Sequence, residues 1–244
     1  TFLLMPTGGG KTAVAIIAAL CLDGVSVVVL PTVALQNDQL ARLMRTPLHR
    51  SFYASVDSTA MRLLQSQDQE VRKRARDDLT GVLRAAKIVL TSPEALCGTA
   101  SHHDAASHHD AAEHTVTASD LGPLATVIAD SGVAFSLLIF DEAHLMSQWA
   151  SFRPACRNAR LVRHAFPSVC VLAMTACAAA ADRDRIAEAT GMAMPSAVGH
   201  GDDHVAESDA PLTQPPSSPI PVSMRPPYVV RDGRFALGER TLMR

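Results

Sequence analysis

The sequence predicts an α/β fold in which a parallel sheet is covered by helices on both faces. Apolar and β-branched runs, each too short for a helix, alternate along the chain with longer helix-like segments. A glycine-rich motif and an acidic motif each follow directly after such a run. Because ligands of parallel α/β sheets bind at the carboxyl ends of the strands, both motifs are expected at one edge of the sheet.

Each element of this fold is predicted from its own local pattern. Thr32 has the side chain of an N-cap and precedes a helix that we expect to end at about Met44. Strands are expected where apolar runs are short, at residues 1–5, 25–30, 87–91, 135–140 and 168–174. Helices are expected at residues 12–22, 33–44, 68–86, 121–131, 155–166 and 178–190, with a turn and a short helix after Pro93.

The composition is that of a domain with one sizeable core. The chain has 244 residues, of which 48% are hydrophobic, and its formal net charge is −2, so no general basic surface is expected. It contains no run of 18 apolar residues, and we expect no membrane partner. Five scattered cysteines without a C-x-x-C pair favour reduced thiols in an intracellular protein over a structural zinc site.

The chain divides into an α/β domain and a tail. Residues 1–192 form the expected domain, which starts without an initiator Met and is therefore expected to be part of a longer protein. Within it, residues 99–120 repeat the unit SHHDAA, which indicates a solvated low-complexity insertion or, alternatively, a metal-binding tract. Residues 193–227 are rich in Pro and Ser and predict a linker, and residues 228–244 would begin a truncated second domain.

The segment PTGGGKT, residues 6–12, has the composition of a phosphate-binding loop between a strand and a helix. Its glycines allow several backbone N–H groups to point at phosphate oxygens, and the helix N-terminus adds partial positive charge. Lys11 would reach the outer phosphates of a nucleotide, and the Thr12 hydroxyl would bind Mg²⁺. The alternative is an ordinary glycine turn beside a surface lysine.

The segment DEAH begins at Asp141, directly after the apolar run of residues 135–140. A carboxylate at this position would be a second Mg²⁺ ligand, and Glu142 would then orient and deprotonate an attacking water. The alternative is an acidic helix N-terminus that is favoured by the helix dipole. Because the glycine-rich loop calls independently for such a partner, we expect the catalytic role.

Aromatic residues are rare in this chain, at 4%, yet Trp149 and Phe152 stand close together after the acidic motif. An aromatic ring can stack on any nucleic-acid base, at about 1–3 kcal/mol per base, without reading sequence. Arg153 could pair with phosphate or stack on a ring. The alternative is that the two rings are anchors of the hydrophobic core.

Together these motifs resemble the first RecA-like domain of RecQ-type DNA helicases of superfamily 2. The resemblance rests on MPTGGGKT, VVVLPTVALQNDQL, TSPE, DEAH followed by SQW and FRP, AMTACA and SMRPP, in this order, over residues 2–192 and 223–228. Met5, where a general phosphate loop has Gly, is usual in this family. DEAD-box and DEAH-type RNA helicases lack the SQW and FRP run.

The resemblance implies a RecA-like P-loop NTPase fold, ATP and Mg²⁺ as cofactors, and a role for each matched residue. Phosphate binding falls to Thr7, Gly8, Gly9, Gly10, Lys11 and Thr12, Mg²⁺ binding to Thr12 and Asp141, and catalysis to Glu142, Asp141 and Lys11. Coupling between the ATP site and the DNA-binding side would fall to His144, Gln148 and Thr175. DNA contacts would come from Trp149, Phe152, Arg153, Pro31, Thr32, Thr91 and Glu94, although a helix cap or a strand-end turn explains the last four as well.

The activity implied is that of an ATP-dependent 3′–5′ helicase acting on single-stranded or forked DNA, in the nucleus if the source is a eukaryote. The family run SQWGHDFRP is one residue shorter here, SQWASFRP, with Ala150 and Ser151 in place of the His-Asp pair. The segment AMTACA keeps Thr175 but has Cys177 where the family's ALTATA has its second threonine. A second RecA-like domain with an arginine finger would be needed for unwinding. The alternatives are a nucleotide- or nucleic-acid-binding module without turnover and a translocase on duplex DNA.

Overall fold

A single parallel sheet forms the centre of the molecule. The computed structural model describes residues 1–46, 52–99, 116–176, 180–192, 228–231 and 234–237. Six strands lie in the order β1-β6-β5-β2-β4-β3, and every neighbouring pair is parallel. Their bounds are β1 Phe2–Leu4, β2 Val25–Val29, β3 Tyr53–Val56, β4 Ile88–Thr91, β5 Phe135–Phe140 and β6 Cys170–Thr175.

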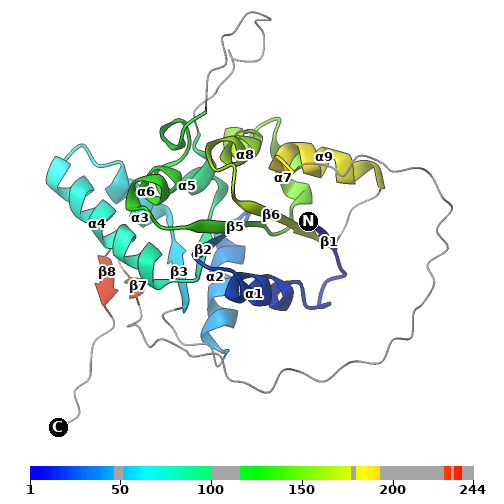
Figure 1. The fold of residues 1–244 in the computed structure, drawn as a ribbon, viewed down its shortest axis with the longest axis horizontal. Helices are drawn as coiled ribbons and strands as arrows, with labels where there is room; N and C mark the ends of the chain where they lie inside the picture. Colours follow the sequence, from blue (N-terminus) through cyan, green and yellow to red (C-terminus); the bar gives the residue numbers. More distant parts are fainter. Residues whose placement is uncertain (47–51, 100–115, 177–179, 193–227, 232–233, 238–244) are drawn as a thin grey trace, which may run out of the picture.

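Helices cover both faces of this sheet, which confirms the predicted fold class. One face carries α1 (Lys11–Cys21) and α2 (Val33–Met44), and the other carries the remaining helices (Figure 1). These are α3 Ser58–Leu64, α4 Gln69–Ala85, α5 Pro93–Cys97, α6 Pro123–Ser131, α7 His144–Trp149, α8 Pro154–Ala165 and α9 Ala180–Thr190. The predicted helices agree with these bounds within about two residues, as is usual for helix ends.

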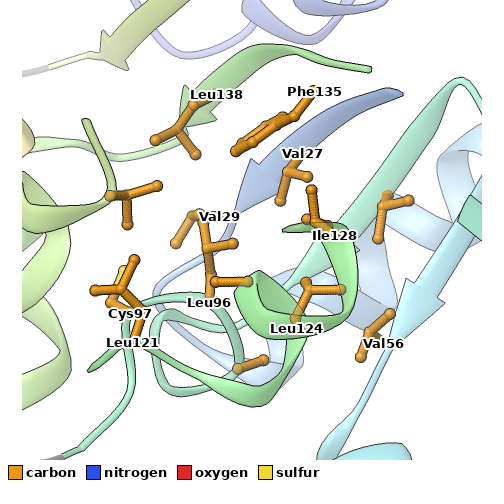
Figure 2. Close-up of a cluster of buried hydrophobic side chains, with 14 of the residues drawn as sticks. Val27, Val29, Val56, Leu96, Cys97, Leu121, Leu124, Ile128, Phe135 and Leu138 are labelled. Atoms are coloured by element: carbon orange, nitrogen blue, oxygen red, sulfur yellow. The ribbon is translucent and has the colours of Figure 1, made fainter. Parts of the chain in front are cut away.

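The two faces of β2 show why a continuous apolar run is needed here. Val27 and Val29 point into the core beneath α5 and α6 (Figure 2). Val28 and Leu30 belong to the core on the other face, beneath α1 and α2. Successive side chains of a strand alternate between faces, so a strand that is covered on both faces is mostly apolar, and in β2 only Ser26 is polar. All five residues of β2 are buried accordingly.

Several elements were not predicted: the edge strand β3, the helices α3 and α7, the 3₁₀ turn Ala118–Asp120 and the strand Arg234–Leu237. Of these, β3 and α3 occupy a stretch without clear periodicity in the sequence. Asp57 caps α3, because its carboxylate accepts hydrogen bonds from the backbone N–H groups of Thr59 and Ala60, both at 2.9 Å. A four-residue strand at a sheet edge leaves a signal that is too short for a pattern argument.

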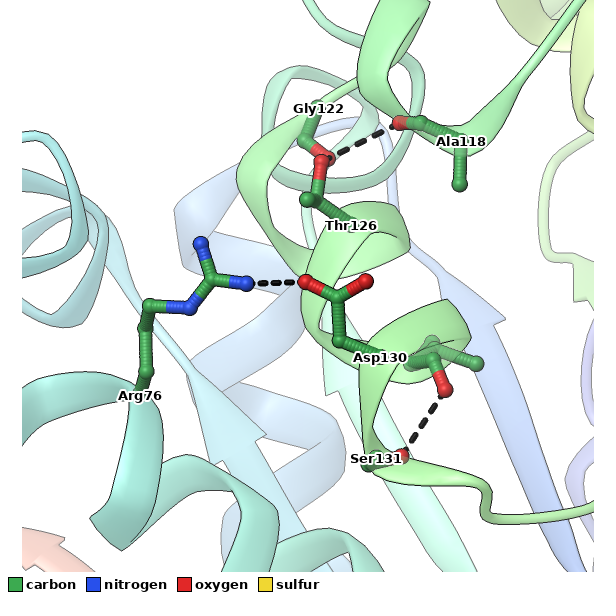
Figure 3. Close-up of polar contacts among 7 residues, drawn as sticks. Arg76, Ala118, Gly122, Thr126, Asp130 and Ser131 are labelled. Atoms are coloured by element: carbon green, nitrogen blue, oxygen red, sulfur yellow. Dashed lines mark hydrogen bonds and ion pairs between the residues drawn. The ribbon is translucent and has the colours of Figure 1, made fainter. Parts of the chain in front are cut away.

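The segment at 99–120 is partly described. Residues 100–115, with all the repeated histidines, lie outside the described residues, as do the predicted linker and most of the tail. Ala118–Asp120 form a 3₁₀ turn, and the Thr126 hydroxyl on α6 donates a hydrogen bond to the Ala118 carbonyl at 3.1 Å. On the same helix Asp130 pairs with Arg76 of α4 (Figure 3). The far end of the insertion is therefore attached to the helical layer.

In the segment expected to begin a second domain, β7, Tyr228–Arg231, pairs antiparallel with β8, Arg234–Leu237. No helix within the described ranges is long and apolar enough to cross a membrane. Four cysteines in the described part of the chain are free thiols: Cys97 and Cys156 are buried, whereas Cys21 and Cys170 are exposed.

Candidate active site

The glycine-rich loop joins the end of β1 to the start of α1 at the carboxyl edge of the sheet. Gly8 and Gly10 have φ values of 82° and 93°, in the left-handed region that favours glycine, although a Cβ at either position would touch nothing. The exposed N-terminus of α1, which follows Gly10, has no side-chain cap among the described residues. Its free backbone N–H groups and partial positive charge are the donors that a phosphate group requires.

Lys11 and Thr12 are the first two residues of α1. The Lys11 ammonium donates a hydrogen bond to the Met5 carbonyl at 3.1 Å, so its side chain folds back over the loop. The Thr12 hydroxyl lies 3.4 Å from the amide nitrogen of Gln39 on α2. Thr12, Gln39 and Asp141 line one small cavity of about 20 Å³. The structure therefore brings together the two residues predicted to bind Mg²⁺.

Asp141 follows β5 directly and is buried, with 7% of its surface exposed. Burial raises the pKa of its carboxyl group, and the charge of Glu142 raises it further, while the charges of Lys11 and Arg42 oppose the shift. A hydroxyl and a carboxylate are the oxygen ligands that Mg²⁺ prefers, and a bound cation would favour the ionised carboxylate. The residues present therefore fit ATP with Mg²⁺.

Glu142 is the one non-glycine residue with positive φ in the described part of the chain, at 47°. Its N–H donates to Asp141 Oδ1 at 3.0 Å, and the flanking N–H groups of Asp141 and Ala143 bind the carbonyls of Val29 and Met174. The turn is thus fixed to the strands on either side of β5. It holds Glu142 in a strained conformation with its carboxylate partly exposed at the site.

His144 and Thr175 connect the acidic motif to β6. The His144 Nδ1 atom lies 2.8 Å from the Thr175 hydroxyl and 3.4 Å from the Glu142 carboxylate. The Thr175 carbonyl in turn accepts a hydrogen bond from the Met5 N–H at 3.1 Å, where the glycine-rich loop begins. One buried threonine therefore touches both halves of the site, as the predicted coupling role requires.

The aromatic residues lie where α7 ends and the chain turns toward α8. The Trp149 ring packs partly against the core, whereas Phe152 is 69% exposed. The two ring centroids are 6.2 Å apart, and Gln148 is exposed beside them. The two alternatives from the sequence therefore apply to different rings: Trp149 is partly a core anchor, and Phe152 is a free apolar surface.

Arg153 does not extend into solvent. Its Nε and Nη2 atoms donate to the two carboxylate oxygens of Glu94 at 2.6 and 2.9 Å, and Nη1 donates to the Pro31 carbonyl at 2.5 Å. Its guanidinium carbon also lies 5.3 Å from the centre of the Trp149 ring. Three residues predicted to contact DNA, Arg153, Glu94 and Pro31, bind one another instead.

Two further residues predicted to contact DNA, Thr32 and Thr91, cap a helix and end a buried strand, respectively. The Thr32 hydroxyl accepts a hydrogen bond from the Leu35 N–H at 3.2 Å and caps α2. Thr91 is completely buried at the end of β4, and its hydroxyl has no hydrogen-bond partner in the described residues. Since a buried hydroxyl cannot touch DNA, the contact predicted for Thr91 is excluded in this conformation.

Two polar residues at the site were missed from the sequence. Arg157 on α8 donates to the carbonyls of Ala150 at 3.2 Å and Ser151 at 3.4 Å, the two positions where the family run is altered. Gln39 contacts Thr12 from α2, the helix that shares one face of the sheet with α1. Arg157 belongs to no motif that was singled out, and Gln39 lies within VVVLPTVALQNDQL but was given no role. No local pattern predicts a contact that depends on how two helices pack.

Comparison with known proteins assigns the family. The model of the DEAD/DEAH box helicase family matches residues 1–186. The chain belongs to this family. Among solved structures, the match to the Hef helicase domain of Pyrococcus furiosus covers 78% of this chain and 33% of that chain, with a TM-score of 0.44 and 15% identity.

The curated relatives of this DEAD/DEAH box helicase domain are RecQ-type. ATP-dependent DNA helicase Q1 of Rattus norvegicus is 28% identical over 72% of this chain and 24% of its own length. ATP-dependent DNA helicase RecQ of Bacillus subtilis is 27% identical over 73% and 24%. ATP-dependent DNA helicase Q-like 4B of Arabidopsis thaliana is 27% identical over 78% and 14%. The chain thus spans about a quarter or less of these relatives.

Proposed function

We propose that this chain is the ATP-hydrolysing domain of an ATP-dependent DNA helicase of RecQ type. The observation that carries the proposal is the meeting of Lys11, Thr12, Asp141 and Glu142 at one edge of the sheet, linked through His144 and Thr175. The glycine-rich loop supplies backbone donors for phosphate, and the similarity to RecQ-type helicases supports DNA as the polymer. The 3′–5′ direction rests on the resemblance alone.

The side chains divide the chemistry among them. Lys11 would bind the outer phosphates, while Thr12 and Asp141 would hold Mg²⁺, which when bound supplies positive charge beside the phosphate oxygens. Glu142, with its partly exposed carboxylate, would orient a water molecule and take its proton. Thr175 and His144 would transmit the state of this site toward α7 and the aromatic residues.

Unwinding would require more than this domain. A second RecA-like domain would bring an arginine finger to the phosphates and would close on ATP, as in related NTPases in which such a finger contributes about 10³–10⁵ in rate. Trp149 and Phe152 would meet single-stranded or forked DNA. Phe152 supports this assignment best, because its ring is already exposed.

The proposal is tested by ATP hydrolysis in the full-length protein with and without single-stranded DNA. Lys11→Ala and Glu142→Gln should each lower the rate by at least about a hundredfold, because one removes phosphate binding and the other the base. Lys73→Ala, at an exposed position of α4, is the matched control and should behave as wild type. Equal rates in all four proteins would contradict the proposal.

The altered run at Ala150 and Ser151 keeps two other functions open, a binding module without turnover and a translocase on duplex DNA. A wild-type protein that binds nucleotide but does not hydrolyse it would favour the first. Displacement of a triplex strand without separation of a duplex would favour the second.

A further inference from the structure

Arg153 joins three segments that are far apart in the sequence. Its edge binds Glu94 at the start of α5 and the Pro31 carbonyl after β2, and its face lies over Trp149 at the end of α7. All three guanidinium nitrogens are therefore engaged, and so is the plane of the group. Bidentate arginine–carboxylate pairs are strong and directional, so this geometry fixes the orientation of the guanidinium.

Glu94 is the residue that sets this orientation. Both of its carboxylate oxygens accept from Arg153. Burial alone would raise the pKa of Glu94, but the hydrogen bond and charge of Arg153, together with hydrogen bonds from the Glu94 backbone and Ser92, hold that pKa below its usual value. A carboxylate at this position repels a nucleic-acid phosphate, so a direct DNA contact is a poor explanation for it.

The contact between Arg153 and Pro31 connects the arginine to the hydrolytic site through the backbone at the end of β2. Pro31 lies two residues after Val29, whose carbonyl accepts the N–H of Asp141 at 3.1 Å. A displacement of the Trp149 ring would therefore disturb the Arg153 guanidinium beside it and the hydrogen bond of that group to the Pro31 carbonyl at the end of β2. The backbone there is directly hydrogen-bonded to the residue predicted to bind Mg²⁺.

We propose that Glu94 is a positioning residue that, through Arg153, holds Trp149 against the end of β2 and so couples nucleic-acid binding to ATP hydrolysis. The proposal rests on the proposed function for the hydrolysis step. Phe152 provides the exposed ring for a base, and Trp149 lies behind it at 6.2 Å between centroids. Glu94 touches neither nucleotide nor DNA in this scheme and acts only through the arginine.

The single tryptophan of the chain gives a direct readout of this contact. In the full-length protein, Glu94→Gln keeps the size of the side chain but removes the charge that orients Arg153. We expect the fluorescence of Trp149 to shift and its quenching by acrylamide to increase. The ratio of DNA-stimulated to basal ATP hydrolysis should fall about fivefold or more, in the range typical of coupling between sites. Arg153→Lys should act in the same direction.

The controls separate this role from a purely structural one. Asp130→Asn breaks the similar pair between α6 and α4, away from Trp149, and should change neither the fluorescence nor the ratio (Figure 3). The double variant of Glu94→Gln and Arg153→Lys should be no worse than the more severe single variant, because both residues act as one unit.

Three outcomes overturn the proposal: unchanged Trp149 fluorescence in Glu94→Gln, an unchanged ratio despite altered fluorescence, or additive effects in the double variant. A wild-type protein whose ATP hydrolysis does not respond to DNA would overturn the proposed function instead. In that case the fluorescence measurement still decides whether Glu94 positions Trp149.

Discussion

The Nδ1 atom of His144 lies 2.8 Å from the Thr175 hydroxyl, although 31 positions separate the two residues. Thr175 is fully buried at the end of β6, and His144 opens α7. Their contact joins the acidic motif to β6, and the Thr175 carbonyl on β6 accepts the N–H of Met5, where the glycine-rich loop begins. It makes a defined prediction about hydrolysis.

Thr175→Val should lower the maximal rate of ATP hydrolysis about tenfold, equivalent to about 1.4 kcal/mol, with a smaller effect on KM. Valine keeps the shape of the side chain but leaves His144 without this hydroxyl. Thr175→Ser keeps the hydroxyl and is the matched control, expected to retain most of the rate. Steady-state kinetics checks both variants, and equal losses in the two would show that packing rather than the hydroxyl is needed.

Much of the fold follows from local sequence patterns. The β-branched run of β2 and the apolar run of β5 predict doubly covered strands, and the position of Asp141 directly after β5 predicts its place at the sheet edge. What could not be predicted is the partner of Arg153. Its contact with Pro31 spans 122 positions, and only the strand order brings the two together.

The positive φ of Glu142 could not be predicted either, because nothing in its local sequence indicates a left-handed backbone conformation. Here the tertiary hydrogen bonds of the neighbouring N–H groups override the local preference. Such strain is found where function or packing constrains a side chain.

The variants Phe152→Ala and Trp149→Ala should differ in how much they destabilise the domain, but both should weaken its response to DNA. Phe152→Ala should cost less than about 0.5 kcal/mol of unfolding free energy, since its ring is 69% exposed. Trp149→Ala should cost about 2 kcal/mol, because its ring packs partly against the core. Both should weaken stimulation by single-stranded DNA. Denaturant unfolding and ATPase assays test this, and a wild-type response in Phe152→Ala would exclude stacking on that ring.

Gly10→Ala and Gly81→Ala should change stability in opposite directions, although a Cβ at either position has open space. Gly10 has φ +93°, so alanine there should cost about 1–2 kcal/mol and should also weaken ATP binding. Gly81 lies inside α4, where alanine should stabilise the domain by about 0.5–1 kcal/mol. Thermal unfolding of both variants is the measurement. Equal shifts would mean that the loop does not require the left-handed conformation.

The four free thiols should react in two groups. Cys21 and Cys170 are exposed and should be alkylated rapidly at pH 8, whereas Cys97 and Cys156 are buried and should react only after unfolding. Burial raises the pKa of Cys156 to about 11, against an ordinary value of 9.0. Peptide mapping by mass spectrometry resolves each site. Early labelling of Cys156 in the native state would contradict the packing of α8 on α5.

The raised pKa of Cys156 predicts how stability changes at high pH. Between pH 9.0 and about 11 the unfolded Cys156 thiol loses its proton while the folded one keeps it. The unfolded state then binds fewer protons, so the unfolding free energy should fall as pH rises through this window. Cys156→Ser should reduce that dependence, because serine does not titrate there, and an unchanged slope would show that other groups cause it.

Glu142→Gly should abolish hydrolysis while making the domain more stable than Glu142→Gln does. Both variants lose the carboxylate, and both remove its repulsion of Asp141, so their difference isolates the backbone. At φ 47° a side chain destabilises the folded state by about 1–2 kcal/mol, and glycine removes this strain. Glycine also loses more conformational entropy on folding, which offsets about 0.5–1 kcal/mol of that gain. The glycine variant should therefore unfold with a free energy higher by about 0.5–1 kcal/mol. Denaturant titrations measure this difference. If the glutamine variant were equally stable, the turn would store no strain, and the position of Glu142 would follow from its side-chain contacts alone.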